Sequence, residues 1–91
     1  MENNALKINP ADNVAIAMRQ IRQGEEIVVD GVALLQAAGD IPASHKVALV
    51  DIMAEGNVLR YGEPIVQAKE EIKKGSWVHV HNTHPIERRL Q

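Results

Sequence analysis

Two histidines near the end of the sequence, His79 and His81, are spaced for shared chemistry. They are two positions apart in a run, Trp77 to His81, whose pattern is typical of a β-strand, so both imidazoles should leave that strand on the same face. Two rings at this spacing can bind one metal ion. The alternative is a polar face turned toward a ligand or another subunit, with Asn82 just beyond it.

The dipeptide His45-Lys46 is a second candidate for chemistry. An internal repeat of 31 residues aligns it with Val14-Ala15, so one copy carries a titratable ring and a cation where the other copy is apolar. A histidine near its ordinary pKa can act as a general acid or base, and a lysine can pair with a substrate carboxylate. A solvent-exposed turn without a chemical role is the alternative.

Two further turns carry polar side chains. In Tyr61-Gly62-Glu63-Pro64 the carboxylate of Glu63 either contacts a ligand or is an ordinary exposed turn residue. The pair Asp12-Asn13 is equally consistent with local hydrogen bonding in a cap or an Asx-turn. From the residues alone, these patterns indicate a binding or assembly domain with a histidine-rich end.

The composition excludes several classes of function. The 91 residues include no cysteine, so the chain provides no disulfide, thiolate nucleophile or iron–sulfur ligand. Ten basic and twelve acidic residues give a net charge of −2, which does not favour nucleic acid as a partner. The sequence shows neither a signal peptide nor an apolar run of membrane-spanning length, so we expect a cytoplasmic protein without membrane contact.

The segments that carry these residues are predicted to be strands. Short β-rich runs alternate with glycine-containing turns, which predicts an all-β fold. The segments 14–21 and 45–52 are ambiguous, and β-branched residues in the second favour strand for both. The clearest strand candidates are Lys7-Ile8, Ile27–Val29, Val32–Leu35, Val58–Tyr61 and Trp77–His81.

The repeat of 31 residues covers most of the chain. It aligns Ile21 with Ile52 and Ile27 with Val58, and it also matches Gly31 to Gly62. Two copies of one supersecondary unit can bury against each other a face that neither could bury alone. The sequence therefore predicts two similar halves.

Four motifs can be read together: Asp12-Asn13-Val14-Ala15, Ser44-His45-Lys46-Val47-Ala48-Leu49, Tyr61-Gly62-Glu63-Pro64-Ile65 and Gly75-Ser76-Trp77-Val78-His79-Val80-His81-Asn82. In this order and spacing they resemble the N-terminal SAF-type domain of the altronate and galactarate dehydratase family. The resemblance implies a SAF-like β-clip fold with two pseudo-repeated halves and short helical turns, spanning residues 1–84 and followed by a polar tail at 85–91.

The resemblance also implies a function: a small subunit or N-terminal module that eliminates water from a hexonate together with a large dehydratase subunit. In the family, a divalent metal, usually iron, stabilises the enediolate, and here we expect the partner to hold most of its ligands. The implied catalytic residues are His45 and Lys46, and the implied metal ligands are His79 and His81. The residues implied for binding the sugar-acid substrate are Asp12, Asn13, Tyr61, Glu63 and Asn82.

Two positions depart from the family pattern. Ser44 stands where the family has Gly before His-Lys, and Val66 stands where the family closes its Tyr-Gly motif with Gly. Both departures bear on substrate identity. The alternatives are the small subunit of a sulfolactate sulfo-lyase, which eliminates sulfite, and a non-catalytic SAF-type module for carbohydrate binding or assembly. A homo-oligomer is also compatible with the sequence.

Overall fold

The computed structural model describes residues 2–86 and shows only strands and turns over that range, which confirms the all-β class. No helix in this range is long and apolar enough to cross a membrane. The predicted tail extends to residue 91, and its residues 87–91 lie outside the described part. The strands are β1 (Ala5–Leu6), β2 (Val14–Ala17), β3 (Glu26–Val29), β4 (Val32–Gln36), β5 (Lys46–Ala48), β6 (Asn57–Arg60), β7 (Glu63–Ala68), β8 (Trp77–Val78) and β9 (Thr83–His84).

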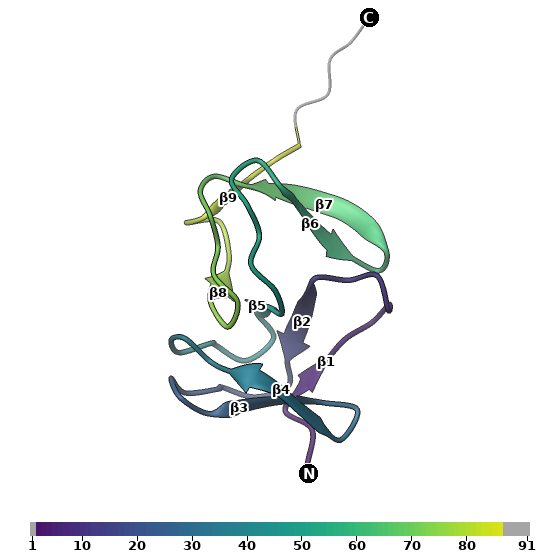
Figure 1. Cartoon of the computed structure of the whole chain (residues 1–91), viewed down its shortest axis with the longest axis vertical. Coiled ribbons are helices and arrows are strands. Elements are labelled where there is room, and N and C mark those ends of the chain that lie inside the picture. The colour runs from purple at the N-terminus through teal and green to yellow at the C-terminus, as the bar shows by residue number, and fades with distance from the viewer. Residues whose placement is uncertain (1, 87–91) are drawn as a thin grey trace, which may run out of the picture.

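A central antiparallel sheet in the order β1-β2-β5-β8 separates two lobes. One lobe is the β3–β4 hairpin, and the other is the three-stranded sheet β6-β7-β9. Figure 1 shows the two lobes at opposite ends of the central sheet. Each hairpin turns through two residues of positive φ, Asp30-Gly31 and Tyr61-Gly62, as two-residue I′ hairpin turns require.

The two lobes confirm the predicted repeat. Strands β6 and β7 begin 31 positions after β3 and β4, respectively. Each hairpin has a register shift at the same place, between Ile27 and Val28 in the first and between Val58 and Leu59 in the second. The chain therefore forms the same bulged hairpin twice, and both hairpins share the central sheet.

Each half has its own core cluster, and the two clusters also follow the repeat. Alternating side chains of β2 separate them, because Ala15 and Ala17 face the first lobe and Val14 faces the second. The first cluster comprises Ala5, Ala15, Ala17, Ile21, Ile27, Val29, Ala37, Ile41 and Val47. The second comprises Val14, Ala48, Ile52, Val58, Ala68, Ile72 and Val78.

An asparagine ties each hairpin to the central sheet at its bulge. The Asn4 side chain donates to the Glu26 carbonyl and accepts from the Val28 N–H, at 2.7 and 2.8 Å. The Asn13 side chain donates to the Asn57 carbonyl and accepts from the Leu59 N–H, at 2.9 and 2.8 Å. A bulge leaves backbone groups without ladder partners, and these amides satisfy them.

Several predicted element boundaries were wrong. The first strand is Ala5–Leu6 and not Lys7-Ile8, and the ambiguous segments are strands only at 14–17 and 46–48. The last predicted strand ends at Val78, because the Asn82 side chain accepts the His79 N–H at 3.0 Å and closes a turn. The expected helical turns are absent from residues 2–86, where isolated turns such as Met53 to Gly56 take their place.

Candidate functional site

Strands β5 and β8 bring three histidines around one tryptophan. Val47 pairs with Trp77 and Lys46 with Val78, so the next pair along brings His45 opposite His79. The imidazoles of His45 and His79 have centroids 4.6 Å apart. The Trp77 ring lies 5.5 Å from His45, 5.5 Å from His79 and 4.9 Å from His81. We call these four residues the histidine cluster.

The hydrogen bond from Trp77 determines which nitrogen of His45 carries the proton. The indole Nε1–H donates to His45 Nδ1 at 3.1 Å. An indole nitrogen is only a donor, so Nδ1 must be the unprotonated nitrogen that accepts. The neutral ring therefore carries its proton on Nε2, and His45 presents a donor to any ligand that approaches that edge.

The change Trp77→Phe tests this tautomer. Without the indole donor, neutral His45 should populate both tautomers, which long-range ¹H–¹⁵N spectra of the ring nitrogens distinguish. His84, whose Nδ1 faces the Pro85 carbonyl oxygen at 2.8 Å and whose Nε2 faces the Glu55 carboxylate at 3.1 Å, is the internal reference, and its signals should stay unchanged in the variant. A native protein whose neutral His45 is protonated on Nδ1 would contradict this assignment.

His79 has an environment that disfavours its charged form. Burial, followed by the charges of His45, Lys46 and His81, holds the pKa of His79 below its usual value. The buried Asn82 fixes the backbone here, because its side chain accepts from the His79 N–H and donates to the Trp77 carbonyl at 2.9 Å. Asn82 thus supports the cluster through the backbone.

The donor set of the cluster does not by itself complete a metal site. Within residues 2–86, no three His, Cys, Asp or Glu side chains gather as a metal-binding group. His79 and His81 each contact the Trp77 ring, and Nδ1 of His45 is engaged by the indole. A metal at His79 and His81 would need further ligands from elsewhere, and this site stays a prediction.

A surface pocket of about 450 Å³ opens beside the cluster, a size that suits a small ligand. Trp77, His81 and Asn82 line it together with Ala38 and Gly39. Three acidic residues, Asp40, Glu70 and Glu71, also line it. Ionised carboxylates only accept hydrogen bonds, so this pocket suits hydroxyl groups better than an anionic end of a ligand.

Lys46 and His45 point to opposite faces of the central sheet, because side chains of successive strand residues alternate. Lys46 lies between Ile16 and Val78 in register. Burial, followed by the charge of Arg60, holds the pKa of Lys46 below its usual value. His45 and Lys46, both implied as catalytic, therefore do not share one face of this sheet.

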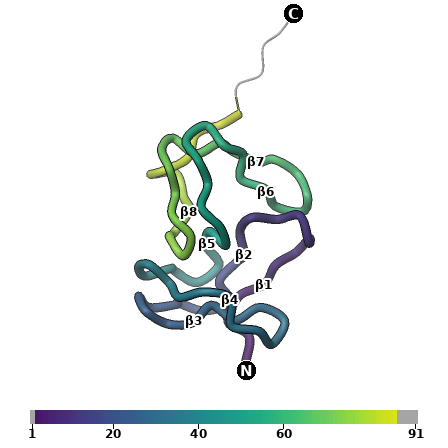
Figure 2. The backbone as a smooth tube through the Cα atoms, viewed as in Figure 1, coloured from purple at the N-terminus to yellow at the C-terminus, as the bar shows by residue number. Residues whose placement is uncertain are grey.

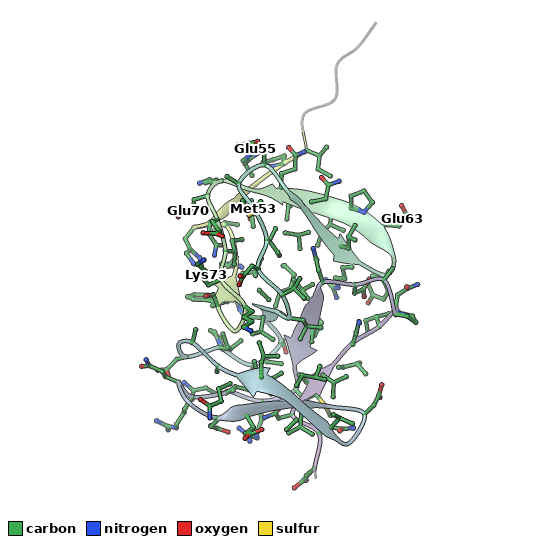
Figure 3. All side chains as sticks on the ribbon, in the orientation of Figure 1. Met53, Glu55, Glu63, Glu70 and Lys73 are labelled. Atoms are coloured by element: carbon green, nitrogen blue, oxygen red, sulfur yellow. The ribbon has the colours of Figure 1, made fainter. Side chains whose placement is uncertain are left out.

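Three other predicted ligand residues, Asp12, Tyr61 and Glu63, gather at the β6–β7 turn. Asp12 is buried, and its carboxylate accepts the N–H groups of Asn9, Tyr61 and Gly62 at 3.1, 3.1 and 2.7 Å. Glu63 is exposed at the start of β7, on the opposite side of its lobe from the pocket residue Glu70 (Figure 3). Figure 2 shows this turn and β8 on opposite sides of the molecule.

Asp12 and Asn13 therefore hold the backbone of the β6–β7 hairpin. Purely local hydrogen bonds, the alternative considered for them, do not describe them fully, because both side chains also bond to residues 44 to 50 positions later in the chain. Sequence reasoning also missed two residues, Trp77 and Arg60. Trp77 was visible as the one tryptophan, two positions before His79. Arg60 carried a signal in the repeat, because it matches the apolar Val29.

Comparison with known proteins identifies the family. Residues 3–85 match the altronate/galactarate dehydratase SAF domain. The chain is 40% identical over 78 residues to altronate dehydratase of Bacillus subtilis (strain 168) and 44% identical over 80 residues to that of Escherichia coli (strain K12). Each alignment covers 86% of this chain and 16% of the relative, so the chain spans about a sixth of their length.

A shorter relative matches as well. The (2R)-sulfolactate sulfo-lyase subunit alpha of Paracoccus pantotrophus is 42% identical over 48 residues, covering 53% of this chain and 72% of that subunit. The match of residues 3–85 covers nearly the whole chain. The chain therefore belongs to the altronate/galactarate dehydratase SAF domain family.

Proposed function

We propose that this chain is the SAF component of a sugar-acid dehydratase and that a larger partner supplies the rest of the active site. Support comes from relatives named altronate dehydratase and galactarate dehydratase, of which the chain matches only a small part. The partner is then either a separate large subunit or the remainder of a longer polypeptide. The open pocket beside the histidine cluster is consistent with an active site that a second domain or subunit completes.

The reaction removes a proton next to the carboxylate, breaks the neighbouring C–O bond and releases water, and the enol then becomes a 2-keto-3-deoxy acid. The Trp77–His45 hydrogen bond carries our assignment, because it leaves His45 with a proton on Nε2. We assign this N–H as a hydrogen-bond donor to the departing hydroxyl; the base that takes the carbon-bound proton and the acid that protonates the hydroxyl are assigned to the partner. The pocket carboxylates would accept hydroxyls of the sugar chain. The divalent metal, iron in our expectation, is assigned mainly to the partner, and no step of this chain depends on it.

Reconstitution tests the proposal. The purified chain is assayed for keto-acid formation from altronate and galactarate, alone and with a large dehydratase subunit from the same organism, with iron added to every sample. We expect no turnover by the chain alone and turnover by the combination. Turnover by the isolated chain would contradict a need for a partner, and a large subunit that is fully active by itself would contradict a catalytic contribution.

A second candidate is the small subunit of a sulfo-lyase, favoured by the match to 72% of a separate subunit named for sulfolactate. Sulfite release from (2R)-sulfolactate by the same combination distinguishes it. Sulfite release from sulfolactate, without keto-acid formation from altronate or galactarate, would replace the dehydratase proposal. If the subunits assemble but turn over none of these acids, the chain would be a non-catalytic binding module.

A further inference from the structure

The pocket beside the histidine cluster has one acidic side chain that the fold leaves unused. Of the three acidic residues that line it, Asp40 accepts the Gln23 N–H through Oδ1 at 2.9 Å. Glu71 pairs with Lys73 at 3.2 Å. Glu70 forms none of the side-chain hydrogen bonds or ion pairs found among residues 2–86. Its carboxylate is therefore available to a ligand.

The negative charge of Glu70 has no counter-charge in the pocket wall. Among the described residues, neither a lysine nor an arginine lines the pocket, and Lys73 is engaged by Glu71. An anionic group that enters would lie close to the Glu70 carboxylate, and like charges repel more strongly where protein displaces water. A hydroxyl group would instead donate a hydrogen bond to it. The pocket therefore distinguishes the two groups by charge.

Trp77 connects this pocket with His45. It pairs with Val47, whose side chain shares a face of the central sheet with His45. Its indole donates to the His45 ring, and the same residue lines the pocket. In the function proposed above, the departing hydroxyl lies at His45, and the partner acts on the carbon next to the carboxylate. The far end of the acid is then the part that extends along Trp77 into the pocket.

We propose that this pocket selects its substrate by the charge of the far end and that Glu70 is the specificity-determining residue. The inference rests on the proposed function and narrows its substrate class. A hexonate such as altronate ends in a hydroxymethyl group, which can donate to Glu70. A hexarate such as galactarate ends in a second carboxylate, which Glu70 repels. The substrates are therefore monocarboxylic sugar acids, and a like charge excludes the dicarboxylic ones.

The change Glu70→Gln tests the role of the charge, because the amide loses the charge and keeps an acceptor oxygen. The control, Glu26→Gln, makes the same change at an exposed position of the other lobe. Each chain is assembled with the large subunit, and kcat/KM is measured for altronate and for galactarate. His81 also lines the pocket, so the assays are made at pH 8, where histidine is ordinarily uncharged.

We expect the native assembly to prefer altronate over galactarate by on the order of 10-fold or more in kcat/KM. Glu70→Gln should reduce this preference on the order of 10-fold, mainly because galactarate is used better, and Glu26→Gln should leave it unchanged. Glu70→Lys, which places a cation at the same position, should favour galactarate further. Equal use of both acids by the native assembly overturns the proposal, as does a preference that persists in Glu70→Gln.

Binding measurements separate this inference from the proposed function. If no combination of subunits turns over either acid, the dehydratase proposal fails, and calorimetry of both acids with the chain, alone and assembled, decides the inference. Tighter binding of altronate, with the difference reduced in Glu70→Gln, would still support selection by charge. Binding of neither acid would overturn it. Loss of assembly in Glu70→Gln would assign Glu70 to a basic side chain of the partner and would overturn it as well.

Discussion

Replacing Asp12 by asparagine is expected to destabilise the chain strongly at neutral pH, far more than the matched change Asp30→Asn. Three backbone N–H groups converge on the Asp12 carboxylate. An amide has only one oxygen to accept them and brings an NH₂ group toward the remaining donors. Asp30 is exposed at a turn position of positive φ, which asparagine tolerates. Urea unfolding of both variants measures the difference.

The same variant should lose part of the acid sensitivity of the fold. Burial alone would raise the pKa of Asp12, but hydrogen bonds from Gly62, Tyr61 and Asn9, with the charge of Lys7, bring it below its ordinary value of 3.8. A lowered folded pKa means that the ionised carboxylate stabilises the fold fully above that ordinary value, and that this contribution is lost as the pH falls through the lower folded pKa. Equal loss of stability between pH 5 and pH 2 in the native chain and in Asp12→Asn would contradict this role.

The second large effect is expected for His45→Phe in the reconstituted enzyme. Phenylalanine keeps an aromatic ring beside Trp77 but has no N–H to donate to the departing hydroxyl. The value of kcat should therefore fall on the order of 100-fold, with a much smaller change in KM. The Val80→Ala variant, at a side chain that is 71% exposed, serves as the control. Unchanged kcat with intact assembly would remove His45 from the reaction and leave it as a partner of Trp77.

The fold was accessible from the sequence because its main feature is periodic. Isoleucine and glycine positions that recur after 31 residues mark the hairpins and their turns, and these hairpins exist. The end of the last strand was not accessible in the same way. It depends on the Asn82 side chain competing for the His79 N–H, and periodicity carries no information about such a local hydrogen bond.

The site was only partly accessible. Sequence spacing grouped His79 with His81, and cross-strand pairing then added His45 through a register that no local pattern encodes. The sequence grouped Asp12 and Glu63 with the ligand residues by motif, whereas the structure shows that Asp12 supports a turn and that Glu63 lies at its exposed edge. Arg60 was not predicted, because an arginine at the end of a strand is common. It stands out only when the equivalent residue of the first repeat, Val29, is known to be buried.

The shared central sheet has a consequence for the order in which the chain folds. Each hairpin pairs residues that are near neighbours in sequence, such as Val29 with Val32, and isolated hairpins of this kind close in about 1–10 μs. The central sheet pairs Ile16 with Lys46 and Val47 with Trp77, so each of its inner contacts must close a long loop before it contributes. The rate-limiting step is therefore expected to be the docking of two preformed hairpins through β2, β5 and β8.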